Sequence, residues 1–155
     1  AAMNIARAAA PEMVAADNQA ETVLLAVLLE HPDMAADCQD TIEEVGFVHK
    51  GYGEIFKVLL SVQDEENPVE KLTSLLDDEQ VSMVAGLLSR HIVDSDCEKI
   101  IEDCLRQMKE TFLKQQYEKH RLLADEFERS GDKRFIDELM ESQRIQHEIK
   151  KLYGS

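Results

Sequence analysis

The sequence of 155 residues contains no tryptophan, only six glycines and three prolines, and three cysteines. Glycine and proline interrupt regular structure, so their scarcity favours long helices over a fold of short strands and turns. Basic residues are also few, with 17 Lys and Arg against 32 Asp and Glu and a formal net charge of −15. Proteins that bind phosphate groups usually carry a surplus of Lys and Arg. The acidic balance of this chain therefore argues against direct binding to nucleic acid or to an anionic membrane surface.

Long apolar runs are absent too, since the best one, residues 23–29, is far too short to span a membrane. Cys38, Cys97 and Cys104 form an odd set without zinc-site spacing, so we expect free, buried thiols in a reducing cytoplasm. The histidines are scattered, and no catalytic motif is present. The sequence therefore predicts no metal, no cofactor and no catalytic residue. Residues 1–17 are predicted to be a linker or partly ordered tail of a fragment from a longer protein.

Residues 18–112 are predicted to form a helical bundle. A first helix, capped by Asn18 and ended by Pro32, is apolar on nearly all sides between residues 23 and 29, which predicts a central position. One or two short helices are expected before Gly46. In the next helix, five apolar residues share one face at steps of three and four: Tyr52, Ile55, Phe56, Leu59 and Val62. Asn67 is expected to cap a further helix that begins at Pro68.

A different architecture begins at Ser95, which forms an S-x-x-E capping box with Glu98. No glycine or proline follows until after Arg129, which predicts one helix of about 33 residues, roughly 50 Å long. Gly131 and Asp132 suit a helix end and the next N-cap, before a last helix over residues 133–153. The predicted fold class is all-α, with an N-terminal helical bundle, a long helix and a C-terminal antiparallel helical hairpin over residues 113–155.

Charge and apolar content divide at the same place. Residues 1–96 hold 5 Lys and Arg against 19 Asp and Glu, whereas residues 97–155 hold 12 against 13. The hairpin also has more apolar residues than a single helix–helix seam can bury: Phe127, Phe135, Ile136, Leu139, Met140, Ile145, Ile149, Leu152 and Tyr153. Part of this set is expected to contact a partner protein, to pack back on the bundle or to pair two hairpins in a homodimer.

Several stretches resemble the C-terminal, helicase-binding domain of bacterial DNA primase (DnaG). They are ETVLLAVLLEHP at residues 21–32, GFVHK at 46–50, YGEIF at 52–56, the long helix from Ser95, the Ser130-Gly131-Asp132 turn and QHEIKKL at 146–152. The resemblance implies a non-catalytic domain of primase, a DNA-directed RNA polymerase. It also implies docking on the N-terminal domain of the replicative helicase (DnaB) hexamer, coupling priming to unwinding.

By matching position, the resemblance assigns helicase contact to the hairpin. The implied contact residues are Tyr117, Arg121, Phe127, Phe135, Leu139, Arg144, Ile145, Ile149, Leu152 and Tyr153. The chain would then be cytoplasmic and a monomer in isolation. Two alternatives stay open: the N-terminal domain of the replicative helicase itself, which would self-associate into rings, and an unrelated all-α adaptor that dimerises through the hairpin.

Overall fold

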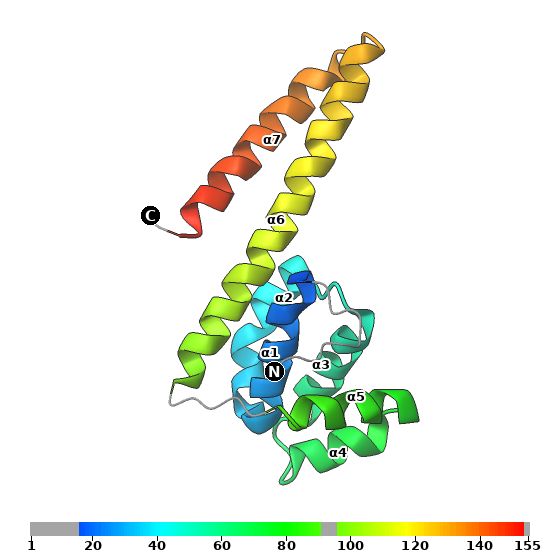
Figure 1. The fold of residues 1–155 in the computed structure, drawn as a ribbon, viewed down its shortest axis with the longest axis vertical. Coiled ribbons are helices and arrows are strands. Elements are labelled where there is room, and N and C mark those ends of the chain that lie inside the picture. The colour runs from blue at the N-terminus through cyan, green and yellow to red at the C-terminus, as the bar shows by residue number, and fades with distance from the viewer. Residues whose placement is uncertain (1–15, 91–95, 154–155) are drawn as a thin grey trace. The chain divides into compact units, whose positions relative to one another are not determined.

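The computed structural model describes residues 16–90 and 96–153, and these ranges contain seven α-helices, one 3₁₀ helix and no strand (Figure 1). The elements follow in the order α1 (Ala16–Glu30), η2 (Pro32–Cys38), α2 (Gln39–Val45), α3 (Lys50–Val62), α4 (Pro68–Leu75), α5 (Asp78–Leu88), α6 (Cys97–Arg129) and α7 (Arg134–Lys151). The predicted all-α class is confirmed. No described helix is both long enough and apolar enough to cross a membrane.

The helices form two compact units that divide between Met108 and Lys109, inside α6. We call the first unit the bundle and the second the hairpin. The bundle contains α1 to α5 and the first part of α6, and the hairpin contains the rest of α6 together with α7. The sequence had placed this boundary at residues 112 and 113.

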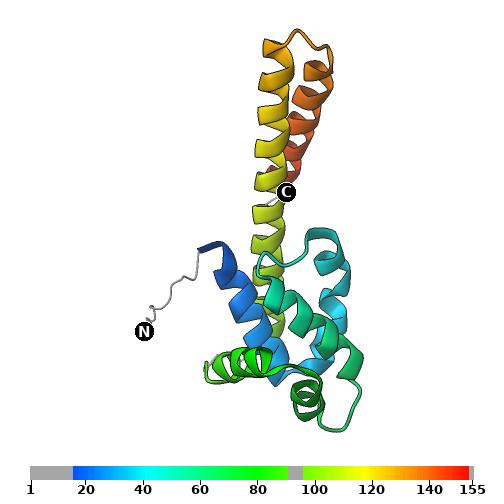
Figure 2. The ribbon, with the colours of Figure 1, turned by 90° about the vertical axis from the view of Figure 1, so that its right-hand side faces the viewer.

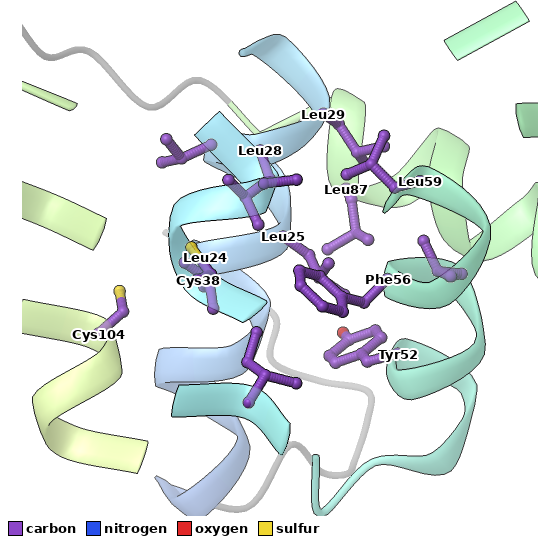
Figure 3. Packing of buried hydrophobic residues seen from close by; sticks show 14 of the residues in the cluster. Leu24, Leu25, Leu28, Leu29, Cys38, Tyr52, Phe56, Leu59, Leu87 and Cys104 are labelled. Atoms are coloured by element: carbon purple, nitrogen blue, oxygen red, sulfur yellow. The ribbon is translucent and has the colours of Figure 1, made fainter. Parts of the chain in front are cut away.

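Helix α1 is the centre of the bundle, as its apolar run predicts. Leu24, Leu25 and Leu28 have no exposed surface, and α1 packs against η2, α3 and α5 (Figure 3). Full burial of each such side chain contributes about 1.5–3 kcal/mol relative to an exposed one. The helix begins at Ala16, two residues before the predicted cap at Asn18, and it ends at Glu30 before the predicted proline. Its burial on nearly all sides places it at the centre of the apolar core.

Helix α3 begins at Lys50, two residues before the predicted apolar face, and the loop before it is held by two sets of hydrogen bonds. The His49 ring accepts a hydrogen bond from the Tyr52 backbone N–H at 3.4 Å, which caps the first turn. The buried Glu21 carboxylate accepts hydrogen bonds from the Val48 and His49 backbone N–H groups at 2.7 and 3.1 Å. The five-residue apolar face predicted for this helix is buried in the core. Helix α1 therefore fixes the entry of α3 through a single carboxylate.

The observed helix caps differ in part from the predicted ones. Asn67 is in the N-cap position of α4, with Pro68 in the first turn as predicted, but its side chain makes no capping hydrogen bond. The sequence reading missed a complete capping box between Asp77 and Gln80 at the start of α5. The predicted Ser95 capping box lies outside the described residues.

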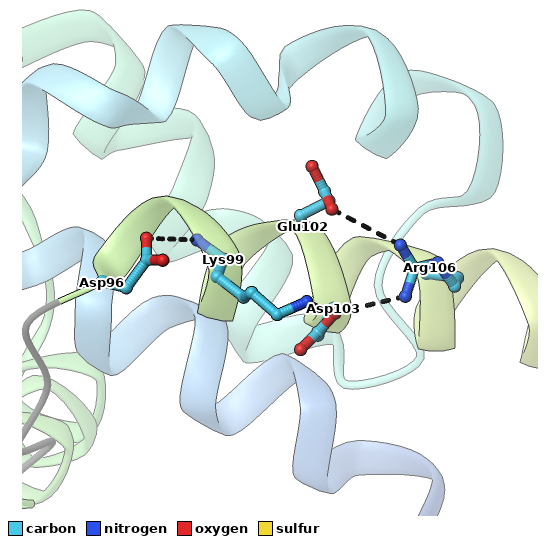
Figure 4. A network of polar contacts seen from close by, with 5 residues as sticks. All are labelled: Asp96, Lys99, Glu102, Asp103 and Arg106. Atoms are coloured by element: carbon cyan, nitrogen blue, oxygen red, sulfur yellow. Dashed lines mark hydrogen bonds and ion pairs between the residues drawn. The ribbon is translucent and has the colours of Figure 1, made fainter.

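The start of α6 is held by charged side chains on one helix. The Asp96 carboxylate accepts from the Lys99 backbone N–H at 3.1 Å (Figure 4). Arg106 then pairs with Glu102 at 3.4 Å and with Asp103 at 3.2 Å, spacings of four and three residues. Such pairs each stabilise an exposed helix by about 0.2–0.5 kcal/mol. The opposite face of this segment supplies Ile101, Cys104 and Met108 to the bundle core.

The hairpin follows the predicted turn closely. Figures 1 and 2 both show α7 antiparallel to the later part of α6. Gly131 has φ +74°, a backbone conformation that glycine adopts without a Cβ clash. The N-cap position of α7 is Lys133, one residue after the predicted cap, but the Asp132 carboxylate still accepts from the Arg134 backbone N–H at 2.9 Å.

Candidate protein-interaction surfaces

The seam between α6 and α7 is narrow and only partly apolar. Its buried residues are Leu113 and Ala124 on α6 and Ser142 and Ile145 on α7. Leu113 and Ala124 are eleven residues apart, and Ser142 and Ile145 are three apart; both spacings keep the pair on one face of its helix. Four small or medium side chains form a far smaller core than that of the bundle. Most of the large apolar side chains of the hairpin therefore lie at the edge of this seam or outside it.

Polar and aromatic contacts hold the two helices together along the seam. His120 Nδ1 lies 2.5 Å from a Glu138 carboxylate oxygen, and the Tyr153 hydroxyl donates to Glu110 at 2.6 Å. Near the turn, the Arg134 guanidinium lies 4.4 Å from the centre of the Phe127 ring. This stacking is a cation–π contact. The three contacts lie near the turn, midway along the seam and at the end of α7, so they fix the pairing of the helices along most of its length.

The ten hairpin residues expected to contact helicase occupy different environments. Ile145 is 2% exposed in the seam, whereas Leu139 and Tyr153 are 43% and 57% exposed. Arg121 and Arg144 are partly exposed and pair with carboxylates on their own helices. The other five are half-buried: Tyr117, Phe127, Phe135, Ile149 and Leu152. Of the ten, Leu139 and Tyr153 offer the most free apolar surface to a partner.

Three further apolar side chains are exposed on the hairpin; none was among the ten implied helicase contacts, although Ile136 and Met140 were in the apolar set too large for one seam. Ile136 and Met140 are 50% and 63% exposed and lie with Leu139 on one side of α7, away from the seam. Leu122 on α6 is 54% exposed. The spacing of residues 136, 139 and 140 was the available signal, because it forms a second stripe beside the seam stripe. We call Ile136, Leu139 and Met140 the α7 face.

A second candidate surface is a groove of about 710 Å³ in the bundle, between α2 and α3. Its apolar lining comes from Ile42, Phe47, Phe56 and Leu60, and the Phe47 and Phe56 rings lie 5.7 Å apart. The polar lining residues are Gln39, Glu43, Lys50, Glu54 and Lys57, and the remaining two are Gly46 and Gly53. A cavity of this size and polarity is within the range of ligand- and peptide-binding sites.

Electrostatics separate the two units more sharply than the sequence division at residue 96 did. Residues 1–108 hold 7 Lys and Arg against 22 Asp and Glu, so the bundle carries the whole net charge of −15. Residues 109–155 hold 10 of each sign. A strongly anionic unit repels nucleic acid and also repels a second copy of itself. The neutral hairpin carries no such penalty, which favours it as a contact surface.

Two of the three cysteines, Cys38 and Cys104, are buried in the bundle core. Burial raises the pKa of Cys38 to about 11, helped by Asp37, and burial raises the pKa of Cys104 to about 11, helped by Asp103. Both thiols therefore stay protonated and unreactive near neutral pH, and the prediction of free thiols in the core is confirmed for them. Among the described residues, no group of three or more His, Cys, Asp or Glu side chains is arranged to hold a metal ion.

Residues 14–81 match the family of DnaB-like helicase N-terminal domains. This segment extends through α1, η2, α2, α3 and α4 into the start of α5, all in the bundle, and it is less than half of the chain. No curated protein and no solved structure matches the chain. The chain is therefore similar to a helicase N-terminal domain over most of the bundle, and the hairpin lies outside the matched segment.

This match corrects the interpretation drawn from the sequence. The resemblance to the C-terminal domain of primase was wrong, since the family that matches residues 14–81 is that of the helicase N-terminal domain. The assignment to primase, and with it to a DNA-directed RNA polymerase, was wrong for the same reason. The stretches at residues 21–32 and 46–56, which carried that resemblance, both lie inside the helicase match. Both stretches belong to the bundle.

Proposed function

We propose that the chain is a non-catalytic protein-interaction domain of the helicase N-terminal type, which associates with other subunits of a replicative DNA helicase in the cytoplasm. The family match to residues 14–81 carries this proposal. The expectation of a monomer belonged to the primase interpretation. A helicase N-terminal domain is instead expected to self-associate.

Within this proposal, the hairpin provides the contacts with other helicase subunits. The ten residues expected to bind helicase are retained as candidates, with Leu139 and Tyr153 the most exposed apolar ones. Large apolar side chains that stay exposed on a narrow two-helix unit are typical of a protein interface. The absence of net charge on the hairpin supports the same role, because two bundles of charge −15 repel each other.

Sedimentation velocity of the full chain over a concentration series, from about 1 to about 100 μM, tests the proposal. We expect the mass to rise with concentration, and we expect the double variant L139S/M140S to shift this rise to higher concentration. Leu75→Ser is the matched control, since Leu75 is a comparably exposed leucine in the bundle. Far-UV circular dichroism checks that each variant is folded. A wild-type chain that stays monomeric throughout the series would overturn the proposal.

A further inference from the structure

The groove between α2 and α3 is an apolar depression with an incomplete charged rim. Ile42 and Phe56 are buried at its base, and Phe47 and Leu60 are half-buried. Gly46 precedes Phe47 with φ +71° and ψ 178°, a conformation open almost only to glycine, and this fixes how the chain enters the groove wall. The Glu21 carboxylate holds the backbone of Val48 and His49 just beyond. The groove is therefore a preformed feature of the bundle.

Two lysines on the rim have no ion-pair partner among the described residues. The bundle segment over residues 16–90 has four cationic side chains, and two of them, Lys50 and Lys57, line this groove. Neither forms an ion pair with any residue that the structure describes. Both are exposed on α3, seven residues apart, and so lie on the same side of the helix. The same lining also includes Glu43 and Glu54, so Lys50 and Lys57 leave this rim without net charge in a unit that is otherwise strongly anionic.

The α7 face has the complementary features. Ile136, Leu139 and Met140 have the i, i+3, i+4 spacing by which amphipathic helices enter apolar grooves. Asp137 flanks this face, is exposed, and has no ion-pair partner among the described residues. The hairpin as a whole is neutral, so it can approach the bundle of another copy without the repulsion that two bundles experience.

We propose that the α2–α3 groove of one copy holds the α7 face of a second copy, with Asp137 placed beside Lys50 and Lys57. This inference rests on the proposed function, because it names the surfaces through which the chain self-associates. The contact is heterologous, since two different surfaces of the chain meet, and repetition of it generates rings or open chains of subunits. Each subunit then uses its groove for one neighbour and its α7 face for the other.

Two variants, each defective at one surface, test the contact. The groove variant is K50E/K57E and the helix variant is L139S/M140S; all four residues are exposed, so both chains should fold. Lys71→Glu is the matched control, because Lys71 is an exposed lysine of the bundle outside the groove. By sedimentation velocity we expect each double variant to weaken self-association about tenfold or more, and the control to change it little.

Mixing the two variants distinguishes this contact from other modes of association. An equimolar mixture retains one intact groove and one intact α7 face, so we expect heterodimers at concentrations where each variant alone is monomeric. In a single chain, adding Asp137→Lys to K50E/K57E should restore part of the lost association. A groove variant that associates as tightly as the wild type, or a mixture that forms no heterodimer, would overturn this inference and leave the proposed function standing. A monomeric wild-type chain would overturn both.

Discussion

The bundle and the hairpin are stabilised by different means. In the bundle, α1 is buried on nearly all sides and one contiguous apolar core contacts every helix except α7. In the hairpin, four buried side chains are accompanied by ion pairs along both helices, among them Lys114–Glu110, Arg121–Glu118, Arg134–Asp132 and Arg144–Glu141. Apolar burial gives far more free energy than exposed ion pairs do. The hairpin should therefore be the weaker unit.

This difference suggests a division of labour between the units. The bundle buries most of its large apolar side chains and carries a net charge of −15, whereas the hairpin leaves most of its large apolar side chains at least partly exposed and carries no net charge. Exposed apolar surface contributes favourable free energy only when a partner covers it and removes it from water. The hairpin thus has the more to gain from a partner, and the bundle supplies the groove that can receive one.

The largest expected effect is the loss of a central side chain of the bundle. Leu28 has no exposed surface, so Leu28→Ala removes buried methyl groups and leaves a cavity. We expect the free energy of unfolding to fall by about 3–5 kcal/mol. Urea unfolding followed by far-UV circular dichroism measures this change. Leu75→Ala is the control, because Leu75 is 55% exposed and its loss should change stability by no more than about 0.5 kcal/mol.

A large-to-small substitution in the hairpin seam tests whether the hairpin and the bundle unfold separately. Ile145 is 2% exposed in a seam that has only three other buried side chains. In Ile145→Ala, hydrogen exchange should accelerate in peptides from α7 and the later part of α6, with bundle peptides little changed. Leu28→Ala should show the reverse pattern. Equal acceleration of exchange in both units for either variant would mean that the bundle and the hairpin unfold together, which would contradict their separate stabilisation.

A smaller effect is expected from the carboxylate that joins α1 to the loop before α3. In Glu21→Gln, one of the two acceptor oxygens becomes an NH₂ group that faces a backbone N–H in a buried site. We expect a loss of about 1–3 kcal/mol in the free energy of unfolding, measured by urea unfolding. Glu30→Gln on the exposed end of the same helix is the control. A loss no larger than that of the control would show that the carboxylate does not hold this loop.

Sequence patterns predicted most of the bundle helices because their apolar residues recur in clear helical patterns. The unbroken apolar run at residues 23–29 predicted the burial of α1, and the three- and four-residue steps from Tyr52 predicted the buried face of α3. Glu21 was missed because it bonds the backbone of residues 27 and 28 positions away, a contact that no local pattern indicates. Asn67 is in the predicted position without a capping bond, since propensity does not determine how a side chain is oriented.

The surfaces were harder to predict than the fold. The sequence indicated too many apolar residues for one seam, but the division between buried Ile145 and exposed Leu139 depends on how α7 is rotated against α6. The groove was not predicted, because it joins residues of α2 and α3 across a turn at Gly46. Short resemblances within the bundle indicated the wrong family, since apolar helical patterns of this kind are not specific to one family.

Two glycines of the bundle should respond oppositely to the same change. Gly46 has φ +71° and ψ 178°, so Gly46→Ala forces a side chain into a conformation that costs about 1–2 kcal/mol. Gly86 lies within α5, and a Cβ there would meet nothing within 4 Å. Gly86→Ala should therefore raise the free energy of unfolding by about 0.5–1 kcal/mol. Thermal unfolding of the two variants measures both signs, and a stabilising Gly46→Ala would contradict the assigned backbone conformation.

The smallest expected effect is the pH dependence of the hairpin, whose ion pairs lower the pKa of several carboxyl groups. A hydrogen bond from Lys114, and then one from Tyr153, lowers the pKa of Glu110 from its ordinary 4.5, and Arg144 likewise lowers that of Glu141. A lowered folded-state pKa contributes stability above the unfolded value, and this is lost as pH falls through the folded value. We expect the protection of α7 amides, measured against their intrinsic exchange rate at each pH, to fall below about pH 4.5.

Two variants of the Glu110 site separate its two partners. Lys114→Gln should raise the pKa of Glu110 more than Tyr153→Phe does, because the lysine contributes both the stronger hydrogen bond and a positive charge. An exposed pair four residues apart contributes only about 0.3–0.5 kcal/mol, so neither variant should unfold the hairpin. A carboxyl-carbon NMR titration of Glu110 measures the shift in each variant. If Glu110 titrates at the same pH in both variants and in the wild type, the contacts of Glu110 with Lys114 and Tyr153 do not persist in solution.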